Sequence, residues 1–142
     1  MLHFQLVTLS GTKFDDDVNE VTLPTLDGEI GVLQDHMPLV SVATTGAIAV
    51  RRNAKDRDDQ REFFATNGGV IEVADNLLRV LVDEADHADD INEAEAEAAV
   101  ERAAKMKAEA KDQVSLEHAQ SLMDRQAVRL QVAGLKRRNQ RK

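Results

Sequence analysis

The order of apolar and polar positions divides this 142-residue chain into two parts near residue 88. In the first part, short runs rich in Val, Ile, Leu and Thr alternate with turn-forming residues at a spacing of roughly ten residues. This pattern is typical of an antiparallel β-sandwich or a flattened barrel. The strands that we expect cover residues 4–9, 18–23, 30–33, 39–43, 47–51, 62–66, 70–73 and 77–82.

Glycine, asparagine and aspartate mark the turns expected between these strands. They are Gly46, the run Asn67-Gly68-Gly69, the pair Asp75-Asn76 and an acidic turn at residues 15–17.

The stretch from residue 23 to residue 39 holds the residues best suited to shape a corner of the sheet. Proline lacks a backbone donor and glycine permits sharp turns. The strand 30–33 would lie between two turns, with Glu29 and His36 at its two ends. The stretch contains both prolines of the chain and two of its seven glycines: Pro24, Pro38, Gly28 and Gly31.

The second part of the chain has a helical pattern. Between Ile91 and Ala133 there is no glycine or proline, and alanine and long charged residues dominate. Asp90 followed by Glu93 predicts a capping box at the start of the first helix.

A break near residues 112–115, with Ser115 as an N-cap, predicts an antiparallel two-helix hairpin, and one long helix is the alternative. The domains that we expect are a β-sandwich at 1–88 and a helical hairpin with a basic tail at 89–142.

The apolar faces of the two helices are rich in alanine, which buries little area at about 25 cal/mol per Å². We therefore expect helices that are stable as helices but weakly docked on the sandwich, and able to detach from it. The alternative is a hairpin packed permanently on the sheet.

Charge is distributed unevenly along the chain. Residues 1–90 carry 18 acidic and 7 basic side chains, whereas residues 91–142 carry 8 acidic and 11 basic ones. An acidic body with only four aromatic residues argues against nucleic-acid binding. The basic end suggests contact with an acidic protein surface, or else a solubilising tail.

Catalytic motifs are absent from the sequence: there is no nucleophile motif, no glycine-rich phosphate loop and no histidine pair at metal-binding spacing. We therefore expect neither an enzyme nor a metal site. The acidic segment 83–90 lacks the order of an EF-hand and is interpreted as a solvated linker that caps the first helix. Arg102, Arg125 and Arg129 would lie near one another in a hairpin, where they would either bind a triphosphate or form a solvated outer face.

Three segments carry recognisable motifs in a fixed order. They are Gly28-Glu29-Ile30-Gly31-Val32-Leu33 with His36-Met37-Pro38-Leu39, then Gly46 with the strand 47–51, then Asn67-Gly68-Gly69-Val70-Ile71-Glu72-Val73. Together with the acidic junction and the alanine-rich helices, they resemble the epsilon subunit of bacterial F-type ATP synthase, which is related to chloroplast epsilon and mitochondrial delta subunits.

The resemblance implies a sandwich of about ten strands, followed by a two-helix hairpin, in a non-catalytic rotor subunit of the central stalk. The sandwich would bind the gamma subunit and the polar loops of the proton-driven c-ring, with Glu29 near those loops and His36 facing gamma or the ring. The complex would lie peripherally on the cytoplasmic face of the cell membrane.

The resemblance also implies that the helices switch between a compact form on the sandwich and an extended form that blocks ATP hydrolysis. In the extended form the basic end would face the alpha and beta subunits of the catalytic head. The residues of this end are Lys136, Arg137, Arg138, Arg141 and Lys142.

Some members of the family bind ATP on the compact hairpin through a motif Ile-Asp-x-x-Arg-Ala. Here the motif reads Ile91-Asn92-Glu93-Ala94-Glu95-Ala96, so Asn92 replaces the aspartate and Glu95 replaces the arginine. The resemblance implies further arginines in the ATP-binding members, and this chain has arginine at those positions: Arg102, Arg125 and Arg129. The negative charge of Glu95, however, repels phosphate. We expect weak ATP binding or none; tight binding would favour the alternative of a free-standing nucleotide-responsive sensor or adaptor.

Overall fold

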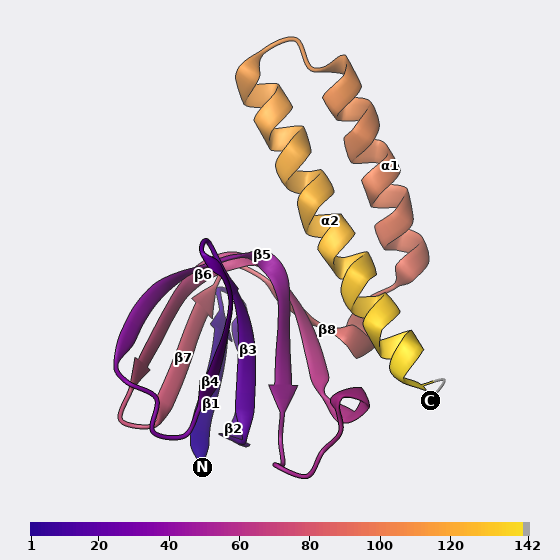
Figure 1. Cartoon of the computed structure of the whole chain (residues 1–142). Helices are drawn as coiled ribbons and strands as arrows, with labels where there is room; N and C mark the ends of the chain where they lie inside the picture. The colour runs from indigo at the N-terminus through magenta and orange to yellow at the C-terminus, as the bar shows by residue number, and fades with distance from the viewer. Residues whose placement is uncertain (141–142) are drawn as a thin grey trace.

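The computed structural model describes residues 1–140, and side chains as far as Lys136, as a β-sandwich from which two antiparallel helices project (Figure 1). The strands are β1 (Leu2–Thr8), β2 (Gly11–Val18), β3 (Glu20–Thr25), β4 (Gly28–Leu33), β5 (Leu39–Arg51), β6 (Glu62–Ala74), β7 (Leu77–Val82) and β8 (Ala85–His87). The helices are the 3₁₀ turns η1 (Asp58–Gln60) and η2 (Ala88–Asp90) and the α-helices α1 (Glu93–Glu109) and α2 (Gln113–Gln140).

The two layers of the sandwich are joined by two long strands. The strand order is β2-β1-β7-β6-β5-β3-β4, with β8 paired to β6. The second half of β6 and the first half of β5 form one layer with β7, β1 and β2. The other halves of β5 and β6 form the second layer with β3, β4 and β8. All pairs are antiparallel except β1 with β7, which is parallel.

Gly46, Gly68 and Gly69 lie where β5 and β6 pass from one layer to the other, so the turns expected at these glycines are wrong. A Cβ at Gly69 would lie 2.0 Å from the carbonyl oxygen of Leu81, and one at Gly46 would lie 2.7 Å from Cβ of Pro24. Glycine is required because another backbone approaches Gly69 closely and the ring of Pro24 approaches Gly46. The described residues form eight strands, and two of them, β5 and β6, contribute to both layers. If each of these two is counted once in each layer, the total is the ten segments that the resemblance implies.

The acidic turn expected at residues 15–17 is also wrong, because these residues belong to the edge strand β2. Only Phe14 and Val18 of β2 are buried, and its aspartates face solvent. An exposed edge strand carries a polar pattern that is easily mistaken for a turn.

Pro24 does not end its strand as the sequence predicted; β3 continues through it to Thr25. Between Thr22 and Thr25 the pairing of β3 with β5 is interrupted, because β5 bends at Gly46. The missing N–H of proline therefore lies where the ladder is broken.

The main core lies between the two layers. It is built from fully buried residues that alternate along the strands with exposed ones, as expected for a sandwich. The largest of them are Phe4, Leu2, Leu6, Leu23, Ile48, Ile71 and Leu78.

The predicted helical hairpin is present, but its caps differ from those predicted. The side chain of Asn92, not Asp90, accepts the N–H of Glu95 at 3.1 Å and begins α1. Asp112, not Ser115, caps α2 by accepting the Ser115 N–H at 2.7 Å, and this bond lowers the pKa of Asp112. The segment 83–90 is not a solvated linker, because it forms β8 and η2.

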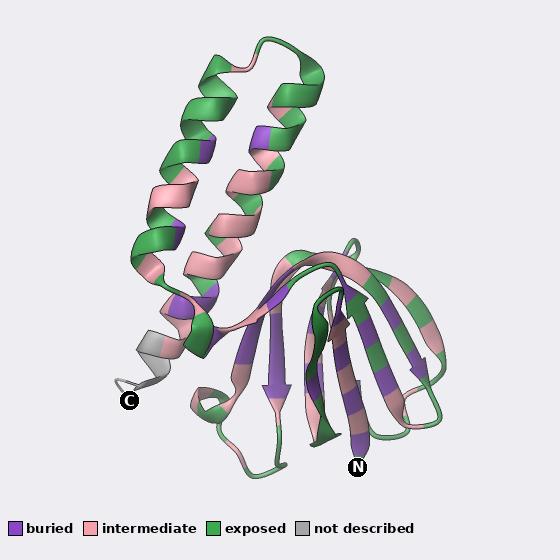
Figure 2. Cartoon of the chain, turned by 180° about the vertical axis from the view of Figure 1, so that it is seen from behind, coloured by how far each residue is buried: buried purple, intermediate pink, exposed green. Residues whose placement is uncertain are grey.

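A second, smaller apolar cluster holds the hairpin on the sandwich. Val132 of α2 packs with Ala49 of β5, Phe63 and Ala65 of β6 and Ala88 of η2. Helix α1 projects away from the sheet and most of its surface is exposed or half-buried (Figure 2). The contact with the sheet is made by α2.

Gly69→Ala is expected to lower the free energy of unfolding by at least about 2 kcal/mol, since backbone atoms of β7 occupy the space that its Cβ needs. Gly134→Ala in α2 is the matched control. Nothing lies within 4 Å of its added Cβ, and alanine favours helix by up to about 1 kcal/mol. Urea unfolding measures both changes. A Gly69→Ala protein as stable as the parent would contradict the close approach.

The stability contributed by His3 should fall as pH rises. Its Nδ1 lies 2.8 Å from Asp17 and its Nε2 2.5 Å from Asp15, and these bonds to Asp17 and then Asp15 raise the pKa of His3. The contribution is therefore complete below about pH 6.5, the unfolded value, and is lost as pH rises through the folded pKa.

Because the imidazole is over one-third exposed, we expect a difference under about 1 kcal/mol between the parent and His3→Gln. Urea unfolding at a series of pH values measures it. If the difference in free energy of unfolding does not change between about pH 5.5 and about pH 8.5, the protonated ring of His3 is not what binds Asp15 and Asp17.

Candidate functional site

The corner at residues 23–39 becomes a β-hairpin and a separate loop. Thr25 and Gly28 close the β3–β4 hairpin, with Gly28 at φ +113, and Leu26 is exposed in its turn. Glu29 follows on β4 and is exposed, and Gly31 lies within β4 rather than at a turn. Exposed Pro38 directly precedes β5.

His36 lies at the other end of β4, so the structure does not bring it together with Glu29. Its Nδ1 lies 2.7 Å from the carbonyl oxygen of Met37, and its backbone N–H donates to Leu33. In the same loop Asp35 has φ +64 and exchanges hydrogen bonds with Asn76 of the β6–β7 turn. The half-buried imidazole therefore bonds within its own loop, and it is Asp35 that ties the loop to the β6–β7 turn.

An exposed apolar row crosses the outer face of the first layer. Val42 of β5 is paired with Val70 of β6, Val70 with Leu81 of β7, and Leu81 with Val7 of β1. Val42 is 51% exposed, and Val70 and Leu81 are each 41% exposed. The hairpin leaves this face open, because α2 packs against Ala49, Phe63 and Ala65 on the second layer. The sequence does not reveal this row, because an exposed valine in a strand has the same pattern as a buried one.

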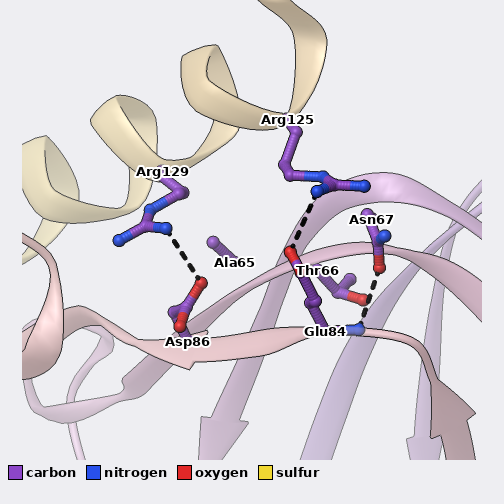
Figure 3. A pocket seen from close by; sticks show the side chains of 7 residues that line it. All are labelled: Ala65, Thr66, Asn67, Glu84, Asp86, Arg125 and Arg129. Atoms are coloured by element: carbon purple, nitrogen blue, oxygen red, sulfur yellow. Dashed lines mark hydrogen bonds and ion pairs between the residues drawn. The ribbon is translucent and has the colours of Figure 1, made fainter. Parts of the chain in front are cut away.

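Two of the three candidate arginines point toward the sandwich (Figure 3). Nη1 of Arg125 lies 3.3 Å from Oε2 of Glu84, and Nη1 of Arg129 lies 3.5 Å from Oδ2 of Asp86. Arg102 on α1 is exposed and does not share these contacts. The three guanidinium groups therefore do not form a single cradle for a triphosphate.

A groove between α1 and α2 is the place where the hairpin could hold a ligand. It has a volume of about 340 Å³ and contains Glu95, Arg102, Gln126 and Arg129, together with alanines of α1. The carboxylate of Glu95 thus shares the groove with the two cations that a phosphate would need. Asn92 caps α1 close by.

The basic end of the chain is described only in part. Lys136 forms an ion pair with Asp89 after β8, so in this conformation it faces the sandwich. The side chains of Arg137 and Arg138 lie outside the described residues, as do Arg141 and Lys142. Among the described residues, no group of three or more histidine or acidic side chains is arranged to hold a metal ion.

Comparison with family models matches residues 1–88 to the β-sandwich domain of the ATP synthase delta/epsilon chain. These residues are more than half of the sequence and form the two layers described above. The chain belongs to the ATP synthase delta/epsilon family. The family predicted from the motifs around Gly28, His36 and Gly68 is therefore confirmed.

Relatives match this family member beyond the sandwich. The ATP synthase epsilon chain of Halalkalibacterium halodurans is 33% identical over 134 residues, which are 94% of this chain and 97% of the relative. The epsilon chain of a Roseiflexus species is 37% identical over 98 residues, covering 69% of this chain and 67% of the relative.

Two solved structures share the fold. A chain in the Euglena gracilis mitochondrial ATP synthase OSCP/F1/c-ring structure aligns with a TM-score of 0.74 at 19% identity, covering 87% of this chain and 75% of that one. A chain in the Tetrahymena thermophila central stalk and c-ring structure aligns at 0.61 and 13% identity, covering 93% and 96%. In residues 1–140 no helix is long and apolar enough to cross a membrane.

The groove predicts that the parent chain binds ATP weakly or not at all, and that Glu95→Arg strengthens binding about tenfold or more, by replacing repulsion with a charge-assisted bond. Glu101→Arg makes the same charge change on α1 outside the residues of the groove and is the control. Calorimetric titration measures both.

Micromolar binding by the parent chain would contradict the prediction and favour the nucleotide-sensor alternative. A gain in Glu101→Arg equal to that in Glu95→Arg would show that net charge, rather than the groove, controls binding.

Proposed function

We propose that this chain is an epsilon chain that works in the central stalk of an ATP synthase and passes c-ring rotation to the catalytic head through gamma. Membership of the family makes it a non-catalytic accessory chain of that complex. The observation that carries the proposal is the match to an epsilon chain over nearly the full length of both chains.

The gamma-binding surface that we propose is the apolar row of Val42, Val70, Leu81 and Val7. Contiguous apolar area on an otherwise acidic domain is typical of a protein interface. The row lies on the layer that the hairpin leaves free, so gamma and the hairpin can bind the sandwich together.

Contact with the polar loops of the c-ring is assigned to Glu29 and the exposed turn at Leu26 beside it. His36 lies at the opposite end of β4, and a ring surface that meets one end of the strand would not meet the other. We therefore give His36 a structural role in its own loop rather than a role in coupling.

The helices are proposed to regulate ATP hydrolysis by leaving the sandwich and extending toward the alpha and beta subunits. The support is that α1 and α2 pack on each other, whereas only α2 attaches them to the sheet through a small apolar cluster. Release would free Lys136 from Asp89 and turn the basic end toward acidic segments of the head. As a component of the complex the chain would be peripheral to the membrane, on its cytoplasmic face.

Val70→Asp is expected to weaken binding to purified gamma at least about tenfold, because a carboxylate would have to be desolvated at the centre of the apolar row. Val114→Asp, at an exposed position where α2 begins, is the matched control and should leave binding unchanged. Calorimetric titration measures the affinities, and circular dichroism checks that both variants fold.

Equal affinity of Val70→Asp and the parent would contradict the proposed gamma surface. Isolation of the tagged chain from solubilised native membranes tests the role itself. Recovery with gamma and the catalytic head supports the stalk subunit, and recovery without them supports the sensor alternative.

A further inference from the structure

We propose that a row of three ion pairs holds the hairpin on the sandwich and that anions loosen it, so that a polyphosphate would release α2 rather than secure it. The ion-pair row consists of Arg125 with Glu84, Arg129 with Asp86 and Lys136 with Asp89. It deepens the regulatory part of the proposed function, on which its consequence for the complex rests.

The spacing of the row follows from the regular structures that carry it. Arg125 and Arg129 are one helical turn apart on α2, about 6 Å along the axis. Glu84 and Asp86 are two residues apart along the start of β8, about 6.7 Å, and lie on one face because Ala85 between them is buried. The two repeats nearly match, so both pairs form while the helix lies along the strand (Figure 3).

The carboxylates of the row are fixed by the sandwich, while the cations move with the helix. The side chain of Asn67 accepts the backbone N–H of Glu84 at 3.1 Å. Asp86 is paired with Ala65 in the ladder between β8 and β6. If α2 left the sheet, Glu84 and Asp86 would therefore stay in position for its return.

Attachment through this row is weak enough to be reversible. Nε of Arg125 and Nε of Arg129 are buried without a hydrogen-bond partner among the described residues, and this desolvation opposes docking. The side chain of Glu84 is 53% exposed, so salt screens its attraction for Arg125.

Anions compete with the carboxylates of the row for the same guanidinium groups. A polyphosphate that takes bidentate bonds from Arg125 and Arg129 displaces Glu84 and Asp86 from them. Its negative charge would also lie against these two fixed carboxylates. Binding of the anion is therefore stronger when α2 has left the sheet, and the equilibrium moves toward release.

The test uses the isolated full chain and a single reactive thiol. Because the sequence has no cysteine, Val132→Cys introduces a unique thiol at a fully buried position of the docking cluster. Its rate of alkylation by iodoacetamide, which is uncharged, reports the fraction of molecules in which α2 is released, however small that fraction is.

In this background, Arg125→Glu and Glu84→Arg should each raise the alkylation rate about 3- to 10-fold, because attraction becomes repulsion. The double variant, which restores an opposite-charge pair, should return to within about twofold of the parent. Lys111→Glu, in the loop between α1 and α2 far from the sheet, is the charge-matched control and should leave the rate unchanged.

Tripolyphosphate should also increase the alkylation rate of the Val132→Cys protein that carries no further substitution. Raising the salt concentration from about 0.01 M to about 1 M should do the same. A rate lowered by tripolyphosphate would overturn the competition, because anion and carboxylates would then be bound together. Failure of the double variant to restore the rate would overturn the ion-pair row. Neither result depends on gamma binding or ATPase inhibition, so failure here is distinct from failure of the stalk role.

Discussion

The pairing of β6 with three other strands is the constraint on which the rest of the molecule depends. Its second half joins β5 and β7 in one layer, and its first half joins β5 and β8 in the other. The bend at Gly68 and Gly69 permits this, since backbone atoms of β5 and β7 fill the space beside both residues. Val70 beyond the bend lies in the exposed apolar row, and Ala65 before it faces the hairpin. One strand therefore positions both candidate interfaces on opposite outer faces.

The hairpin contacts β6 directly through the small cluster of Val132 with Phe63 and Ala65, and indirectly through β8, which pairs with β6. Its helices derive their stability from alanine, capping by Asn92 and Asp112, and contact with each other. Few of these interactions would be lost on leaving the sheet. Docking and helix formation are thus nearly independent, which is the physical requirement for a helical element that moves as a unit.

The sequence predicted the sandwich and the helical hairpin, because hydrophobic period and helix propensity are local properties. The turns that it predicted at Gly46 and Gly68 are wrong, because glycine marks the close approach of another chain segment as well as a turn. The partners of Arg125 and Arg129 were missed because they lie some forty residues away and become neighbours only when β8 pairs with β6. The spacing of the two arginines indicated that they lie one turn apart on the same face of the helix. It could not indicate which surface that face contacts.

The two departures from the nucleotide motif affect different properties of α1. Asn92 has lost the charge of the expected aspartate but still accepts the Glu95 N–H, and asparagine is as good an N-cap as aspartate. Helix formation is therefore preserved at that position. Glu95 adds a negative charge to the groove that contains Arg102 and Arg129, while the sandwich supplies Arg129 with Asp86 as a counter-ion. Carboxylates of the same chain therefore lie beside the cations that a phosphate would need, and this is the physical reason for expecting weak nucleotide binding or none.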